Sequence, residues 1–209
     1  MSEESSASTS AALWEADRRV MSDDDIFDVL QPLPFGWHHE GIRRTGEAYP
    51  LGAFLLVGAT VDVLAGLAYD PDDDRDQRGG RRYAHFVHEY FPPQYTKLGK
   101  TMWEGLRSTP LHYFTTSNIV FADSQPKADL HLTRLDADRV ILHWQEFLGD
   151  YEAARDKYWK RLRCDSQLMS NARARLERRP LMTVANVQRG LTLPMTLSAT
   201  FPPPTTIIV

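Results

Sequence analysis

The residues with the clearest chemical potential lie between positions 107 and 112, where the sequence reads RSTPLH. Arg107 keeps its positive charge and can bind a phosphate through two parallel N–H···O hydrogen bonds, whereas His112 gains and loses a proton near neutral pH. Together they could cleave RNA without a metal, because His112 could take the proton of the 2′-hydroxyl group while Arg107 stabilises the charge that develops at phosphorus. Ser108 would support them as a polar neighbour. This segment is the candidate catalytic site.

The spacing alone is weak evidence, because a chain with 7 histidines and 24 lysine and arginine residues contains such pairs by chance. Arg82 and His88 form another one. Inside the candidate segment, Pro110 has no amide hydrogen and pushes the residue before it away from helical angles. A helix should therefore bend or end between Arg107 and His112, and the bend could either unite the two side chains or separate them.

Asp62 is the second candidate, and it lies inside the most apolar segment of the chain, residues 50–69. On a helix it shares a stripe with Gly58 and Gly66, so another helix could approach it closely. A buried carboxylate needs a partner, because an unpaired charge in a dry core is costly. We predict that Arg107 is this partner, either as a catalytic cation that Asp62 orients or as a salt bridge with no catalytic role.

A basic run in the last third of the chain supplies candidate RNA contacts at Arg155, Lys160 and Arg163. Such a run could follow a phosphate backbone, although acidic residues interrupt it and a solvated helix side is the alternative. His85, His88 and Glu89 could begin a metal site, but a solvated polar face explains them equally well, so we expect no metal.

Composition narrows the class of protein. The 209 residues include 42% hydrophobic and 25% charged residues with a net charge of −4, which permits a packed core and excludes a basic surface over the whole molecule. The single cysteine excludes a disulfide framework and, with no secretory signal expected, favours the cytoplasm. Because the sequence has no Walker, GxGxxG, GxSxG or HExxH motif, we expect no cofactor.

Apolar spacing predicts a mainly α fold for residues 13–180, between a disordered lead at 1–12 and an extended or disordered tail at 181–209. A short helix is expected to begin after Ser22, with Asp25 completing a capping box. The further predicted helices cover 50–69, 83–90, 95–108 and 144–162, the last of which opens the basic run; a loop is predicted at 31–46 and a small β-hairpin at 129–142.

The segment 50–69 is apolar on every side of the helical wheel, so it must be buried in a protein core or in lipid. It is just long enough to span a bilayer, but Asp62 near its centre would cost about 2.5–3.5 kcal/mol there. A core helix is therefore the prediction, with no membrane partner.

The order of three segments resembles the HEPN superfamily: a buried helix with an aspartate (61–67), an aromatic helix that runs into a proline (86–92), and the candidate segment (106–112). The similarity covers roughly residues 48–165, and Arg107, Ser108 and His112 match its motif positions. It implies a HEPN-like helical bundle and a homodimer whose two motifs face one cleft. It also implies metal-independent ribonuclease activity in bacterial defence or toxin systems, which many members have lost.

Two functions follow from these observations. The first is a HEPN-like domain that binds RNA or cleaves it without a metal, with Arg107, Ser108, His112 and Asp62 in its site. The second is a helical protein without catalytic activity that dimerises or holds a partner protein.

Overall fold

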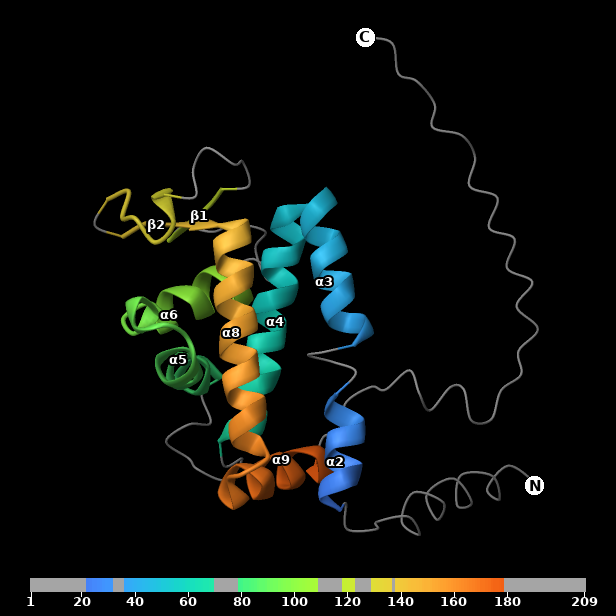
Figure 1. The fold of residues 1–209 in the computed structure, drawn as a ribbon. Coiled ribbons are helices and arrows are strands. Elements are labelled where there is room, and N and C mark those ends of the chain that lie inside the picture. Colours follow the sequence, from blue (N-terminus) through green and yellow to red (C-terminus); the bar gives the residue numbers. More distant parts are fainter. Residues whose placement is uncertain are drawn as a thin grey trace, which may run out of the picture.

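The computed structural model describes residues 22–31, 36–69, 79–108, 118–122, 129–136 and 138–178. This part of the chain is mostly helical, with one small sheet (Figure 1). The predicted lead at 1–12 and tail at 181–209 lie outside it. In chain order the elements are α2 (Asp23–Leu30), α3 (Trp37–Ala48), α4 (Pro50–Ala68), α5 (Gly79–Tyr90), the 3₁₀ turn η1 (Pro93–Tyr95), α6 (Gly99–Met102), the π-helical turn η2 (Trp103–Ser108), β1 (Ile119–Ala122), β2 (Val140–His143), α8 (Trp144–Leu162) and α9 (Ser166–Arg178).

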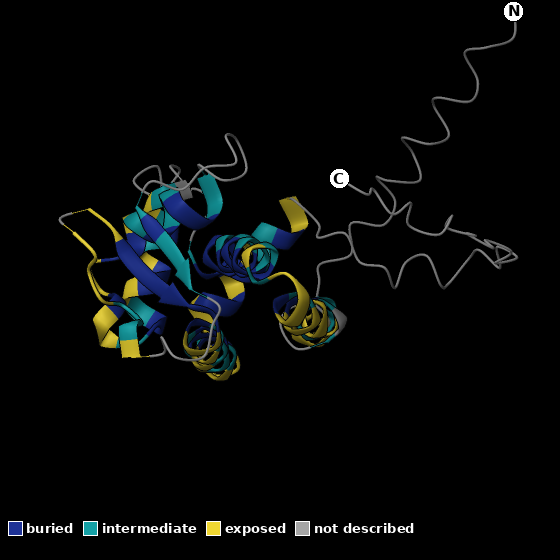
Figure 2. Ribbon diagram, turned by 90° about the horizontal axis from the view of Figure 1, so that it is seen from above, coloured by how far each residue is buried: buried dark blue, intermediate teal, exposed yellow. Residues whose placement is uncertain are grey.

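Helix α4 forms the centre of the core, as its sequence predicts. It contacts α3, α5, α8, α9 and η2, and most of its residues are buried. By length and composition alone α4 could cross a membrane, and it is the one helix of the described ranges that could. Within the fold, 61% of the most apolar stretch of α4 is buried, as expected for a core helix. Figure 2 shows the bundle from above, with blue inner sides and yellow outer sides.

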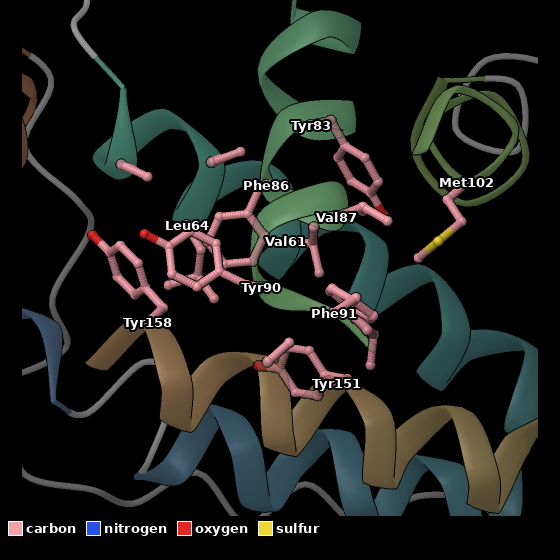
Figure 3. Packing of buried hydrophobic residues seen from close by; sticks show 14 of the residues in the cluster. Val61, Leu64, Tyr83, Phe86, Val87, Tyr90, Phe91, Met102, Tyr151 and Tyr158 are labelled. Atoms are coloured by element: carbon pink, nitrogen blue, oxygen red, sulfur yellow. The ribbon is translucent and has the colours of Figure 1, made fainter. Parts of the chain in front are cut away.

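Aromatic side chains join α5 and α8 beside α4. The ring centroids of Phe86 and Tyr90 lie 4.6 Å apart, and the ring of Tyr158 lies 5.6 Å and 5.4 Å from them. Figure 3 shows these three rings next to Val61 and Leu64 of α4. Full burial of an apolar side chain such as Phe86 contributes about 1.5–3 kcal/mol, so this cluster helps to fix α5 against α8.

The capping box at the start of α2 is confirmed. The amide of Asp25 donates to Ser22 Oγ at 3.2 Å, and the amide of Ser22 donates to the Asp25 carboxylate at 2.8 Å. Two amides that the helix itself cannot satisfy are thereby bonded.

The loop predicted at 31–46 is wrong, because residues 37–48 form helix α3. The glycines of this stretch suggest a loop, but Gly46 is needed for close packing rather than for a turn. A Cβ atom at Gly46 would lie 2.2 Å from the Trp144 ring, so the glycine lets α3 approach the first residue of α8. Ile42 is fully buried on the same helix.

The hairpin predicted at 129–142 is confirmed in part. The amides of Leu132 and Leu135 donate to the carbonyls of Ile141 and Arg139, and Arg134 forms an antiparallel bridge with Val140. The regular ladder was not predicted, because β2 pairs in parallel with β1, with Ile119 opposite Val140. Leu132 has a φ of 63°, a left-handed conformation that interrupts an extended strand. The small sheet is therefore built from residues far apart in the sequence.

One predicted helix changes its bounds, and another keeps them. The helix expected at 95–108 begins only at Gly99, after the 3₁₀ turn η1, and its second half widens into the π-helical turn η2. The helix predicted at 144–162 is confirmed as α8. The basic run after Trp144 is divided between α8 and α9, because Asp165 lies in the break and its carboxylate accepts from the amides of Gln167 and Leu168. Asp165 thus caps the new helix.

Candidate functional site

The predicted partnership of Asp62 and Arg107 is confirmed. Arg107 Nε donates to Asp62 Oδ2 at 2.9 Å, which joins η2 to α4. The two side chains are 32% and 28% exposed, so the pair lies at the edge of the core and one side of it faces solvent. A charge-assisted bond of this kind is stronger than a neutral one and fixes the plane of the guanidinium group.

A glycine on α4 allows this contact. A Cβ atom at Gly58 would lie 2.7 Å from the carbonyl oxygen of Leu106 and 2.8 Å from its Cβ atom. The backbone of η2 therefore rests directly on α4, one turn before Asp62. This confirms the prediction that small residues beside Asp62 permit a close approach.

The local backbone at Arg107 is unusual. Residues 103–108 form a π-helical turn, a rare geometry that is frequent at functional sites. Within it, the guanidinium carbon of Arg107 lies 6.0 Å from the centre of the Trp103 ring. Trp103 in turn packs closely against α5, where a Cβ atom at Gly80 would lie 2.9 Å from the ring. The arginine is thus held by an ion pair on one side and approached by an aromatic ring on another.

Tyr83 of α5 is the buried neighbour of this site. Its ring centroid lies 5.6 Å from that of Trp103, and its hydroxyl has no hydrogen-bond partner within the described ranges. Burial raises the pKa of Tyr83 far above its usual value; the charge of Asp62 raises it further and that of Arg107 opposes the rise. Tyr83 therefore stays protonated and does not act as a base.

Of the other residues of the motif, Ser108 lies within the described residues and His112 does not. Ser108 ends η2 and is partly exposed. His112 lies outside the described residues together with Pro110, so the meeting of Arg107 and His112 stays a prediction. The structure brings Asp62 and Arg107 together, and Ser108 follows Arg107 directly in the chain.

Of the three predicted RNA contacts, two are exposed and one is not. Arg155 is only 8% exposed, and its Nη2 atom lies 2.8 Å from Asp156, which corrects its assignment to an open basic face. The reason is its place on the side of α8 that faces α3, where His39 and Tyr151 are close enough to interact with its charge. Lys160 and Arg163 are exposed, and the guanidinium of Arg163 lies 5.4 Å and 5.8 Å from the ring centres of Phe27 and Trp159.

The candidate metal ligands serve structural contacts. Glu89 accepts from Tyr69 at 3.0 Å and pairs with Arg161, while His85 and His88 are exposed. Across the described ranges, no group of three or more His, Cys, Asp or Glu side chains is placed to hold a metal ion.

Two histidines expected in a loop instead lie on α3. His38 Nε2 lies 2.8 Å from Thr60 Oγ1, whose own proton goes to the carbonyl of Leu56, so His38 donates the bond. Burial lowers the pKa of His38. His39 Nε2 lies 3.0 Å from Glu152 Oε1 of α8. The pKa of His39 is lowered mainly by burial and then by the charge of Arg155. Both histidines therefore help to attach α3.

A partly buried polar cluster that sequence reasoning missed lies near the N-terminal end of α8. Tyr95 donates to Asp150 Oδ2 at 2.8 Å and lies 2.8 Å from His131 Nε2, whose Nδ1 accepts from the backbone amide of His143 at 3.0 Å. Burial raises the pKa of Tyr95, and Asp150 raises it further. The hydrogen-bonded pairs of this cluster are 12 to 55 positions apart, so no local pattern indicates the cluster.

Comparison with known proteins adds no identification. No family model matches the chain, and neither a curated protein nor a solved structure is similar to it. The geometry of the site must therefore carry the functional argument.

Proposed function

We propose that the chain is a HEPN-like RNA-binding domain that cleaves RNA without a metal, in the cytoplasm and as a homodimer. Arg107 binds the scissile phosphate, Asp62 orients Arg107, Ser108 supports the site and His112 acts as acid or base. The observation that carries the proposal is the Asp62–Arg107 ion pair at 2.9 Å, located in a π-helical turn at the surface edge of the core.

The chemistry of the pair supports phosphate binding. Asp62 engages the guanidinium through Nε, and this fixes the direction of the two terminal nitrogens, the atoms that form a fork with a phosphate. A fixed cation stabilises a phosphorane better than a mobile one, because it needs no reorganisation when charge develops.

The proposed reaction is an internal displacement. His112 removes the proton of the 2′-hydroxyl group, the freed oxygen attacks phosphorus, and the bond from phosphorus to the 5′-oxygen breaks. The leaving 5′-oxygen takes a proton from water and His112 later returns its proton to solvent, so the products are a cyclic phosphate and a free 5′-hydroxyl group. Arg107 neutralises the charge of the pentavalent centre between these two steps.

The test is the incubation of single-stranded RNA with the protein in excess chelator. Wild type should cut, whereas His112→Ala and Arg107→Ala should each lose about 100-fold or more of the rate. His88→Ala and Arg43→Ala are matched controls, because both residues are exposed and lie outside the site. His88→Ala also tests the other Arg–His pair of the sequence. Wild-type protein that neither cuts nor binds RNA contradicts the proposal.

A helical dimer without catalytic activity is the second candidate, and exposed apolar side chains favour it. Tyr49 and Leu51, at the junction of α3 and α4, are 74% and 54% exposed. Burying them against a second copy would favour association by about 25 cal/mol for each Å² of apolar surface. A dimer in sedimentation that Leu51→Glu dissociates, combined with inertness toward RNA, would select this function.

A further inference from the structure

A second polar site lies beside α6 and η2, the turn that carries Arg107. It is a pocket of about 340 Å³ between α6, η2 and the start of β2. Its wall on the helix includes Lys100 and Glu104, and the facing wall includes Asn118 and Arg139. This volume lies in the usual range for small-molecule sites, about 300–1,000 Å³.

The facing wall of the pocket is preformed. The segment 129–136, which precedes this wall, is fastened to the core by the buried bonds of His131 to Tyr95 and to the amide of His143. The turn that follows is closed by Asp136, whose carboxylate accepts from the amides of Asp138 and Arg139 at 3.1 Å and 2.9 Å. A rigid wall lowers the cost of ordering the site when a ligand binds.

The carboxylate of Glu104 is held between two donors. Asn118 Nδ2 donates to Glu104 Oε2 at 3.2 Å, and Lys100 Nζ lies 3.7 Å from Glu104 Oε1. The lysine contact is longer than a hydrogen bond, so its ammonium group can turn toward a ligand. The helix side of the pocket therefore presents a carboxylate acceptor with a cationic donor beside it.

The ligand that fits this order of groups has two adjacent N–H donors followed by a carbonyl acceptor. Among the RNA bases, guanine has this edge: its ring N–H and exocyclic amine suit a carboxylate, and its carbonyl suits an ammonium group. Uracil offers one N–H between two carbonyls, and adenine has no carbonyl. Arg139, on the opposite wall, is already paired with Asp136 at 2.6 Å, so the base edge and not the phosphate determines the fit.

We propose that this pocket is a guanine-recognition subsite in which Glu104 is the specificity-determining residue. The inference rests on the proposed function, because it takes RNA as the ligand that reaches both sites. Glu104 and Arg107 belong to the same π-helical turn, so a base in the pocket and a phosphate at Arg107 would be bound by one rigid element.

The test measures the binding of four ribonucleoside monophosphates by calorimetry: those of guanosine, inosine, adenosine and uridine. Guanosine monophosphate should bind about tenfold more tightly than the adenosine compound, which is the lower part of the range for a two-bond base contact. Inosine monophosphate, which lacks the exocyclic amine, should fall between them. Glu104→Gln should remove this preference, whereas Glu177→Gln, an exposed glutamate on α9, should keep it.

Equal binding of the four compounds, no binding of any, or a guanine preference unchanged by Glu104→Gln overturns the inference. Circular dichroism of Glu104→Gln establishes that the variant is folded.

The two proposals fail in different ways. RNA that is cut equally after every base, through His112, with no guanine preference in calorimetry, rejects the subsite and keeps the proposed function. A guanine preference that depends on Glu104, in a protein that neither cuts nor binds RNA, rejects the proposed function and leaves a mononucleotide site.

Discussion

The ion pair between Asp62 and Arg107 can be measured by a double-mutant cycle. The variants are Asp62→Ala, Arg107→Met and the two together; methionine keeps part of the arginine stem beside Trp103. Surface pairs contribute about 0–1 kcal/mol, and loss of one partner of a fully buried pair costs about 3–5 kcal/mol. With side chains 28% and 32% exposed, this pair lies between the two limits. Each single variant should therefore lose about 2 kcal/mol of unfolding free energy.

The cycle isolates the interaction itself. The double variant should be more stable than the sum of the two losses predicts, by about 1 kcal/mol or more, when the free energies come from urea unfolding. The exposed pair of Arg139 and Asp136 supplies a control cycle, for which we expect a smaller coupling because solvent screens the two charges. A coupling no larger than the control, or one that added salt abolishes completely, would refute the argument that the pair fixes Arg107.

RNA affinity separates orientation from simple electrostatics. Asp62→Ala removes a negative charge next to a site for a negative ligand, so electrostatics alone predicts tighter binding. If Asp62 orients the guanidinium fork, binding instead becomes weaker, because Arg107 loses its fixed direction. Fluorescence anisotropy with a short RNA measures the change, and tighter binding by Asp62→Ala would contradict the orienting role.

Two further predictions concern packing and pH. Gly58→Ala should destabilise the fold by about 1–3 kcal/mol in urea, because its Cβ would meet backbone that cannot move aside, whereas Gly41→Ala, with open space around it on α3, should stabilise by about 0.5–1 kcal/mol. Because the pKa of His38 is lowered in the folded state, the unfolded chain binds the proton more readily, and stability should fall as pH drops below about 6.5. His38→Gln should weaken this pH dependence of the melting temperature, and His88→Gln, at an exposed position, should leave it unchanged.

The features that could be predicted from the sequence depend on neighbouring residues. The core helix follows from an uninterrupted apolar segment, and the start of α2 follows from Ser22 and Asp25, three positions apart. The partner of Asp62 could also be predicted, although Arg107 is 45 residues away, because a carboxylate on a core helix requires a cation and the candidate segment at the end of the 95–108 helix supplied one.

The features that could not be predicted depend on contacts between distant segments. Gly46 suggests a loop until Trp144, 98 positions later, is seen to occupy the space where its side chain would be. The parallel pairing of Ile119 with Val140 has no local pattern, and the alternation after residue 129 favours a hairpin instead. The π-helical turn is equally invisible in the sequence, since apolar spacing is compatible with an ordinary helix there.

The position of Asp62 argues for a role beyond stability. A buried ion pair is often no more stabilising than apolar residues of similar volume, so a core helix gains little from a carboxylate. Val61 before it is buried and Val63 after it is 36% exposed, and Asp62 and Arg107 both keep contact with solvent. This edge lowers the desolvation cost of the two charges and leaves the arginine open to a ligand. A pair that served only to join η2 to α4 would not need that access, because Gly58 already brings the two backbones together.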